Sequence, residues 1–262
     1  MRFLGVVATE LMKLRRSKVT WMSLLAYTFM VAMAGFFMWM MMNPGVAASI
    51  GLLGQKARFA FGGQPIDWPA FLTFIVEMGG IGGLIMCSII AAYVFGREYT
   101  EGTAKNMLVL PTARSSFVFA KIIVSAAWFG GLTVWIIAET LLVGSILRLA
   151  AFSSELFLDA AAKLLALALM SLCCSVVVAW VAVETRGYFA PLGFSIFTLV
   201  LASVFGHTGW GPWVPWSIVG LYSGAAGPET TLGWGSFVVI AATLLVGTAL
   251  TIRHEVWADN VQ

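Results

Sequence analysis

Charged residues are scarce in this sequence. Asp, Glu, Lys and Arg make up only 10% of the 262 residues, whereas 60% are hydrophobic, and the mean hydropathy is +0.94. A soluble globular protein would leave too much of this apolar surface in water, so the composition excludes that class and indicates a single domain embedded in a lipid bilayer. The net charge of +3 comes without a long basic tract or a nucleic-acid-binding motif, so nucleic acid is not an expected partner.

Residues that bind metals or perform catalysis are equally scarce. The two histidines, His207 and His254, fall outside the long apolar segments, and the three cysteines fall inside them. This distribution excludes paired intramembrane histidines for haem and any His/Cys cluster with zinc spacing. Cys87, Cys173 and Cys174 are expected to pack as small hydrophobic residues. The sequence therefore predicts no catalytic residue and no metal site.

A phosphate-binding loop is also missing. No stretch fits the pattern G-x-x-x-x-G-K-[ST]. The stretch "FGGQP" at 61–65 matches part of the signature motif of ATP-binding cassettes, but it lies in an expected outer loop and lacks the preceding Leu-Ser. If ATP drives this protein, another chain must bind it.

Six long apolar segments predict an all-α, polytopic membrane protein. Each is long enough to cross a hydrocarbon core of about 30 Å as a helix, and the third is longer than necessary, so we expect it to tilt or to project from the membrane. The segments are residues 19–42, 70–96, 116–147, 157–183, 188–206 and 232–252.

The distribution of Lys and Arg predicts the orientation. Eleven of the 15 lie on the side of the N-terminus, and membrane proteins gather these residues in the cytoplasm, so both termini are expected there. The eleven are Arg2, Lys13, Arg15, Arg16, Lys18, Arg97, Lys105, Arg114, Lys121, Arg186 and Arg253. The outer four are Lys56, Arg58, Arg148 and Lys163.

Residues 1–18 predict an amphipathic helix at the inner membrane interface, with a solvated basic flank as the alternative. Its apolar face consists of Phe3, Val7, Leu11 and Leu14, and Glu10, Lys13 and Arg16 lie largely elsewhere. A cleaved signal peptide is a further alternative, with a cleavage site at 32–34. The apolar run continues to residue 42, which favours an uncleaved first helix.

Glu77 in the second predicted span and Glu139 in the third are acidic, and both lie nearer the outer end of their span. A carboxylate at a helix centre costs about 2.5–3.5 kcal/mol, and less near an interface. Two interpretations remain open: a polar patch that lines a solute path, or hydrogen bonding between helices and to outer water. Gly79 and Gly83 allow close helix packing, within the chain or at a dimer seam.

Tryptophan alternates with proline in the outer segment 207–229. The prolines exclude a regular helix there, and tryptophan prefers the headgroup region. We expect a partly re-entrant segment at the outer interface, or a plain aromatic anchor. The residues concerned are Trp210, Pro212, Trp213, Pro215 and Trp216.

One polar segment, residues 97–115, interrupts the apolar sequence on the predicted cytoplasmic side. Thr103 is expected to cap a short helix that Pro111 ends. Met107, Leu108 and Leu110 would give this helix an apolar patch framed by charge. Such a patch fits a groove on a partner, although a self-packed inner loop remains the alternative.

This segment resembles the loop between the second and third spans of ABC-2 type permeases, the membrane subunits of a class of ATP-driven transporters. The resemblance consists of a pattern E-x-x-E-G-T, a short hydrophobic helix, P-x-x-R and a Lys that opens the next span. The matching residues are Glu98, Glu101, Gly102, Thr103, Leu108, Leu110, Pro111, Arg114 and Lys121. In addition, "PWSIVG" at 215–220 is similar to an outer-loop sequence of the bacitracin and lantibiotic export or immunity branch.

The resemblance implies that residues 97–115 are a coupling segment that docks on a separate ATPase subunit, which binds ATP and magnesium. Coupling would involve Glu98, Glu101, Gly102, Thr103, Leu108, Pro111, Arg114 and Lys121. It also implies two permease subunits, identical or paralogous, around a cavity lined by the second and fifth spans. The residues expected along that path are Glu77, Gly79, Gly83, Glu139, Phe194 and Phe197.

An apolar cavity with an acidic residue suits a hydrophobic or amphipathic cargo. The expected function is therefore export of such a molecule, for example a peptide antibiotic, across or out of the plasma (inner) membrane, with antibiotic resistance as its result. A stand-alone carrier or an intramembrane enzyme is the alternative. Either would need paired acids, deeper charges or repeated halves, and the sequence shows only the separated Glu77 and Glu139.

Overall fold

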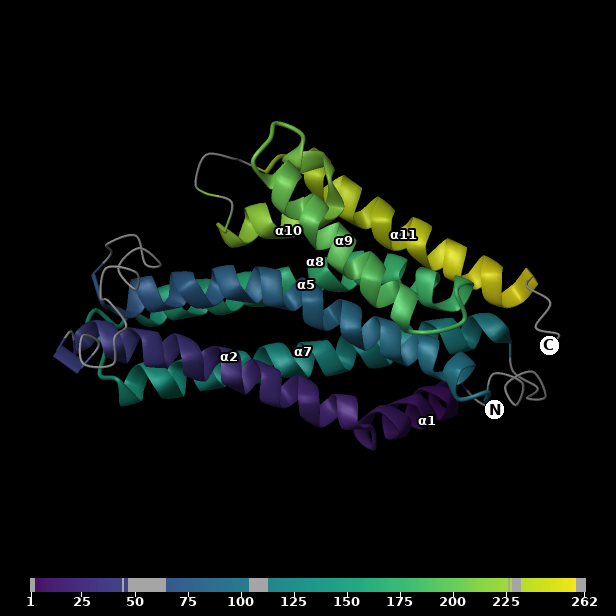
Figure 1. The fold of residues 1–262 in the computed structure, drawn as a ribbon, viewed down its shortest axis with the longest axis horizontal. Coiled ribbons are helices and arrows are strands. Elements are labelled where there is room, and N and C mark those ends of the chain that lie inside the picture. The colour runs from purple at the N-terminus through teal and green to yellow at the C-terminus, as the bar shows by residue number, and fades with distance from the viewer. Residues whose placement is uncertain are drawn as a thin grey trace.

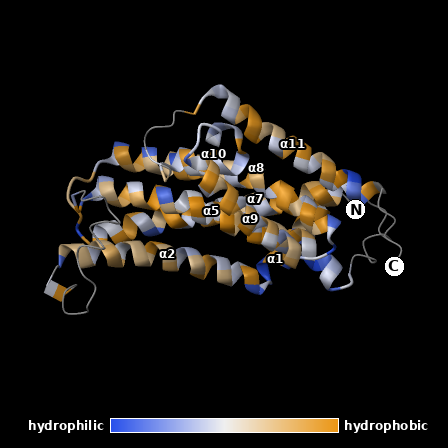
Figure 2. Cartoon of the chain, turned by 45° about the horizontal axis from the view of Figure 1, so that its top comes forward, coloured by the Kyte–Doolittle hydropathy of each residue, from blue (hydrophilic) through white to orange (hydrophobic). Residues whose placement is uncertain are grey.

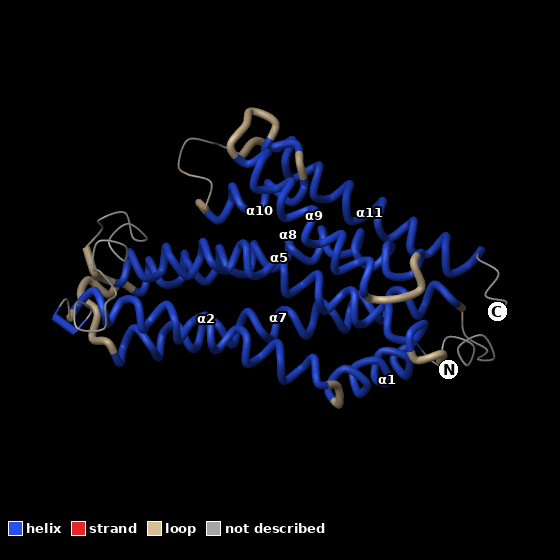
Figure 3. The backbone as a smooth tube through the Cα atoms, viewed as in Figure 1, coloured by secondary structure: helices blue, strands red, loops and turns tan. Residues whose placement is uncertain are grey.

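The computed structural model describes residues 3–43, 45–46, 65–103, 113–225, 227 and 232–257. Within these ranges the chain is helical and contains no strand (Figure 3), which confirms the predicted all-α fold. The helices are α1 (Phe3–Arg15), α2 (Lys18–Met42), α5 (Trp68–Thr100), α7 (Arg114–Ile146), α8 (Ser154–Glu184), α9 (Phe189–Gly206), the 3-10 helix η1 (Gly211–Trp213), α10 (Pro215–Ser223) and α11 (Trp234–Trp257).

Six of the described helices, α2, α5, α7, α8, α9 and α11, are long and apolar enough to cross a membrane. They coincide with the six predicted segments. Both α5 and α7 have 33 residues, or about 50 Å at 1.5 Å per residue, so both exceed the hydrocarbon core. The length of α5 was not expected, because this helix continues past residue 96 through Arg97 and Glu98 to Thr100.

α5 and α8 form the centre of the bundle (Figure 1). α2 and α7 lie along one side of this pair, and α9, α10 and α11 cover the other. The start of α1 and the end of α11 lie at the same end of the bundle, as an even number of crossings requires, and we call it the terminal end. Hydrophilic residues concentrate near the two ends of the bundle and apolar residues run along the helices between them (Figure 2).

Small residues let α5 and α8 approach each other closely. A Cβ atom added to Gly79 would lie 2.6 Å from Leu164 Cδ2, and one added to Gly83 would lie 3.4 Å from Ser171 Oγ. These glycines therefore serve packing within the chain. Large apolar side chains on the outer surface of α2, α9 and α11 remain exposed, as expected of faces that contact lipid: Trp21, Leu25, Phe197, Val200, Val238 and Leu245.

The described part of the segment 207–229 contains two short helices, η1 and α10. The prediction that proline excludes a regular helix here is wrong from Pro215 onward, because proline is tolerated in the first turn of a helix and Pro215 begins α10. This helix packs against α9 and α5, with Ile218 and Val219 buried. It ends at Gly224, whose φ of +88° suits a left-handed cap.

Candidate functional site

A network of five alternating charges lies at the terminal end of the bundle, in the order Arg97, Glu10, Lys13, Glu98 and Lys121. Lys13 Nζ lies 2.6 Å from Glu10 Oε1 and 3.0 Å from Glu98 Oε1. Arg97 Nη2 lies 3.2 Å from Glu10 Oε2, and Lys121 Nζ pairs with Glu98 Oε2. The network thus joins α1 to the end of α5 and to the first turns of α7, the two helices that flank residues 101–113.

Four of the five residues are buried, with exposed fractions of 1% for Glu10, 2% for Lys121, 4% for Glu98 and 6% for Arg97. Removal of one partner from such a buried pair costs about 3–5 kcal/mol, because the other charge is left without compensation. Burial by itself lowers the pKa of Lys13, but the carboxylates of Glu10 and Glu98 outweigh it and raise this pKa above its ordinary value. Lys13 therefore stays charged at neutral pH.

The sequence pattern of α1 did not reveal this network. Residues Val6, Glu10 and Leu14, spaced four apart, form the buried face of α1, whereas Phe3 and Leu11 are exposed. The available signals were the three-residue spacing of Glu10 and Lys13, which places them on one helical face, and the adjacent opposite charges at 97 and 98. Neither signal identifies a partner without the tertiary fold.

The stretch Glu101-Gly102-Thr103 ends α5. Gly102 has a φ of +68°, its N–H donates to the Tyr99 carbonyl at 3.2 Å, and the Thr103 N–H donates to the Glu98 carbonyl at 2.9 Å. These two bonds form a Schellman motif, which satisfies carbonyls that a helix end leaves free. The predicted helix from Thr103 to Pro111, with Leu108 in its apolar patch, falls on residues 104–112, outside the described residues.

The other flank of this segment is joined to α11. Arg114, at the start of α7, donates from Nη1 to the carbonyls of Glu255 at 3.1 Å and Val256 at 3.3 Å. The Tyr99 hydroxyl, near the end of α5, donates to Glu255 Oε1 at 2.8 Å. A guanidinium at the C-terminal carbonyls of a helix also interacts favourably with the helix dipole. The two helices that flank residues 101–113 are therefore fixed to both α1 and α11.

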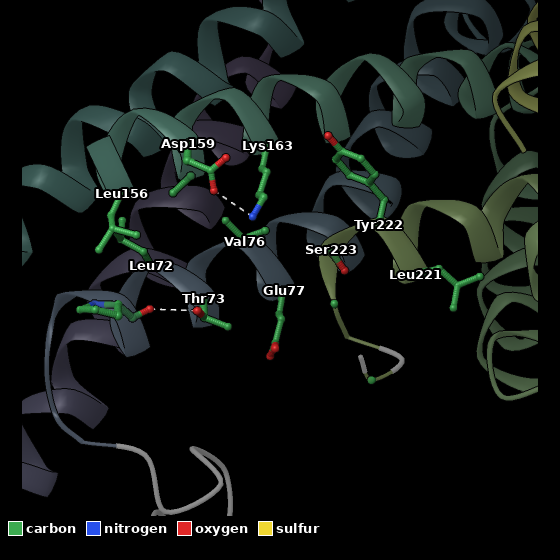
Figure 4. Close-up of a pocket in the computed structure, with 14 residues that line it drawn as sticks. Leu72, Thr73, Val76, Glu77, Leu156, Asp159, Lys163, Leu221, Tyr222 and Ser223 are labelled. Carbon is green, nitrogen blue, oxygen red and sulfur yellow. Dashed lines mark hydrogen bonds and ion pairs between the residues drawn. The ribbon is translucent and has the colours of Figure 1, made fainter. Parts of the chain in front are cut away.

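Glu77 lies at the opposite end of the bundle, in a pocket of about 410 Å³ between α5, α8 and α10 (Figure 4). The same pocket is lined by Asp159 and Lys163 of α8, which form an ion pair at 2.9 Å, and by Tyr222 and Ser223 of α10.

The other residues of the predicted path are not brought together with Glu77. Gly79 and Gly83 face α8, as described above. Glu139 faces α2 and accepts a hydrogen bond from the Thr28 hydroxyl at 2.7 Å. On α9, Phe194 packs edge-on against Trp216, with ring centroids 5.9 Å apart, whereas Phe197 is exposed.

These helices and the two polar ends of the bundle define a multi-pass membrane protein. Residues 6–202 match the ABC-2 family transporter proteins, and the chain belongs to that family. It is also 30% identical over 176 residues to the bacitracin transport permease protein BCRB of Bacillus licheniformis, a match that covers 66% of this chain and 83% of that protein. The chain is accordingly a membrane permease subunit of an ABC transporter.

Proposed function

We propose that this permease is driven by a separate ATPase subunit, which binds ATP and magnesium and docks on residues 97–115 at the cytoplasmic face. The observation that carries the proposal is that the helices on both sides of this segment are fixed to other helices. Glu98 of α5 pairs with Lys13 of α1 and with Lys121 of α7, and Arg114 holds α7 to α11. A force that the ATPase applies to this segment is therefore transmitted to the long helices α5 and α7.

The proposal divides the predicted coupling residues into two groups. Glu98 and Lys121 are buried in the network, so they act by holding α1, α5 and α7 together rather than by touching the ATPase. Glu101 is exposed at the C-terminal cap of α5 and is free to meet a partner directly. Leu108 and Pro111 keep their predicted role in the docking surface.

We place both termini in the cytoplasm, at the plasma (inner) membrane, from the distribution of Lys and Arg, and the charges along α5 and α8 mark the two membrane boundaries. Along α5, Glu77 and Glu98 are 21 positions apart (98 − 77), or about 31 Å at 1.5 Å per residue. Lys163 and Glu184 of α8 have the same separation (184 − 163). Both distances match the hydrocarbon thickness, so the pocket and the network lie near opposite membrane boundaries.

We further propose a hydrophobic or amphipathic cargo that the transporter exports, with two permease subunits, identical or paralogous, around the path. The printed name of the relative, a bacitracin transport permease, supports a membrane-active peptide antibiotic as such a cargo. The apolar surfaces of α9 and α11 support an exporter that takes its cargo from lipid.

The docking proposal is tested by the substitution Glu101→Arg in the permease co-expressed with its ATPase. A reversed charge at a contact between charged rims is expected to weaken co-purification about tenfold and to lower transport-linked ATP hydrolysis. Glu155→Arg is the matched control, because Glu155 is exposed in the first turn of α8 at the opposite end. Equal co-purification of wild type and Glu101→Arg would reject docking at this segment.

A further inference from the structure

The outer pocket between α5, α8 and α10 carries a carboxylate that no described residue neutralises. The charged side chains that line it are Glu77, Asp159 and Lys163. Lys163 pairs with Asp159 at 2.9 Å, and within the described residues Glu77 has neither an ion pair nor a hydrogen bond through its side chain. In Figure 4 the Glu77 side chain extends away from the Asp159–Lys163 pair. The described residues of the pocket therefore carry one net negative charge.

A second feature of the pocket also favours a cation. The last residues of α10, Leu221 to Ser223, and its cap Gly224 form one wall. The C-terminal end of a helix carries a partial negative charge, and the broken helices of membrane transporters use such ends to hold cations. The hydroxyl groups of Tyr222 and Ser223 lie on the same wall.

Apart from Thr73, the other side chains that line the pocket among the described residues are apolar. Leu72 and Val76 of α5 and Leu156 and Ala160 of α8 face the pocket, and its volume of about 410 Å³ lies in the range of small-molecule sites. A simple metal ion would gain nothing from these walls, whereas a cation attached to an apolar group would contact both kinds of surface.

We propose that this pocket binds the ammonium or guanidinium group of a cationic amphiphile, with Glu77 as its counter-ion and α5 and α8 holding the adjacent apolar part. The inference extends the proposed function. The fate of the bound molecule rests on the proposed export, whereas the binding itself does not depend on that proposal. The position of the pocket near the outer membrane boundary means that the molecule enters from the outer leaflet. The source of the cation is a soluble amphiphile or the amine of a lipid headgroup.

The test uses the purified permease in phosphatidylcholine nanodiscs, without ATPase or nucleotide. The probe is dansylcadaverine, a primary amine on a five-carbon chain that ends in an aromatic ring, and its fluorescence anisotropy reports binding above that of empty discs. The neutral N-acetyl derivative is expected to bind at least about tenfold more weakly, because it loses the free energy of one charge-assisted hydrogen bond. Glu77→Gln is expected to cause a loss of the same size, and the exposed control Glu155→Gln none.

A third variant moves binding in the opposite direction and so separates charge from misfolding. Lys163→Met leaves the Asp159 carboxylate without its partner, so two carboxylates in the pocket are then uncompensated and the probe is expected to bind about threefold more tightly. Equal binding of the amine and its acetyl derivative, or wild-type binding by Glu77→Gln, would overturn the proposal. So would an unchanged or weaker affinity for Lys163→Met.

Discs that contain phosphatidylethanolamine distinguish the two sources of the cation. If the wild type binds the probe more weakly in these discs than in phosphatidylcholine discs, and Glu77→Gln does not, the site holds a lipid amine. If the probe binds equally in both kinds of disc, the site holds a soluble amphiphile. Either result supports a site for an ammonium group at Glu77. Because no ATPase is present, a failure of the docking experiment leaves these results intact, and a failure here leaves the docking proposal intact.

Discussion

Glu98 holds a central position among the residues of this permease, because it connects α5 to two lysines on two other helices. Its carboxylate accepts from Lys13 at 3.0 Å and from Lys121, and it is buried. Lys121 Nζ also lies 5.4 Å from the centre of the Phe95 ring, a cation–π distance. The charge of Lys121 is therefore compensated only while α5 and α7 keep their register.

We expect Glu98→Gln to destabilise the isolated permease by about 3–5 kcal/mol, because two lysines lose a shared counter-ion inside the protein. Thermal unfolding in detergent, followed by size-exclusion chromatography, measures the loss. The double variant Glu98→Gln with Lys121→Met should recover part of it, since the buried lysine is then gone. Glu155→Gln, at an exposed residue, should stay within about 0.5 kcal/mol of wild type. A stable Glu98→Gln single variant would show that the network contributes little to folding.

At the scale of elements, the end of α5 is held by a close backbone crossing. Gly96 of α5 lies against the turn between α8 and α9, where Arg186 has a φ of +52°. A Cβ atom on Gly96 would lie 2.7 Å from the Gly187 carbonyl oxygen and 3.0 Å from the Tyr188 nitrogen. Because these atoms belong to the backbone, they cannot move aside as the end of a side chain could. The crossing places α5 beside the α8–α9 turn just before the charged network begins.

Gly96→Ala is therefore expected to destabilise the permease by about 1–3 kcal/mol, as overpacking does. Gly130→Ala is the matched control within a helix, because no atom lies within 4 Å of an added Cβ there. That substitution should stabilise α7 by about 0.5–1 kcal/mol, since alanine loses less conformational entropy than glycine. Thermal unfolding of the two variants in parallel measures both effects. Equal unfolding temperatures would mean that the α8–α9 turn yields at little cost.

At the scale of the whole molecule, two polar sites lie at opposite ends of one helix pair. α5 carries Glu77 in the outer pocket and Glu98 in the network, and α8 carries Lys163 and Glu184 at the corresponding levels. A rigid movement of α5 against α8 would change the geometry of both sites at once. This arrangement gives the proposed ATPase a direct mechanical connection to the proposed ligand pocket.

The orientation of the molecule is tested by single added cysteines and a membrane-impermeant maleimide. We expect Thr208→Cys, between α9 and α10, to label in intact cells, and Thr185→Cys, between α8 and α9, to label only after the cells are opened. Both positions are exposed, and the native Cys87, Cys173 and Cys174 are buried and should give little background. The reverse pattern would place both termini outside and would exclude cytoplasmic docking on residues 97–115.

The sequence by itself determined the class of protein, the six spans and the place of the polar segment, because apolar runs and the absence of charge are local properties of the chain. The resemblance to the family also pointed to Glu98 and Lys121 as candidate coupling residues, and the hydropathy pattern showed Glu77 to be an acidic residue within an apolar span. Whether a carboxylate has a partner depends on helices that are far apart in sequence, and no local pattern contains that information. Only the tertiary structure placed Lys13 of α1 against Glu98, 85 residues away, and Glu10 against Arg97, 87 residues away. In the same way, the packing of α10 against α5 and α8 placed Glu77 in a pocket, and the packing of α7 against α2 placed Glu139 beside the Thr28 hydroxyl.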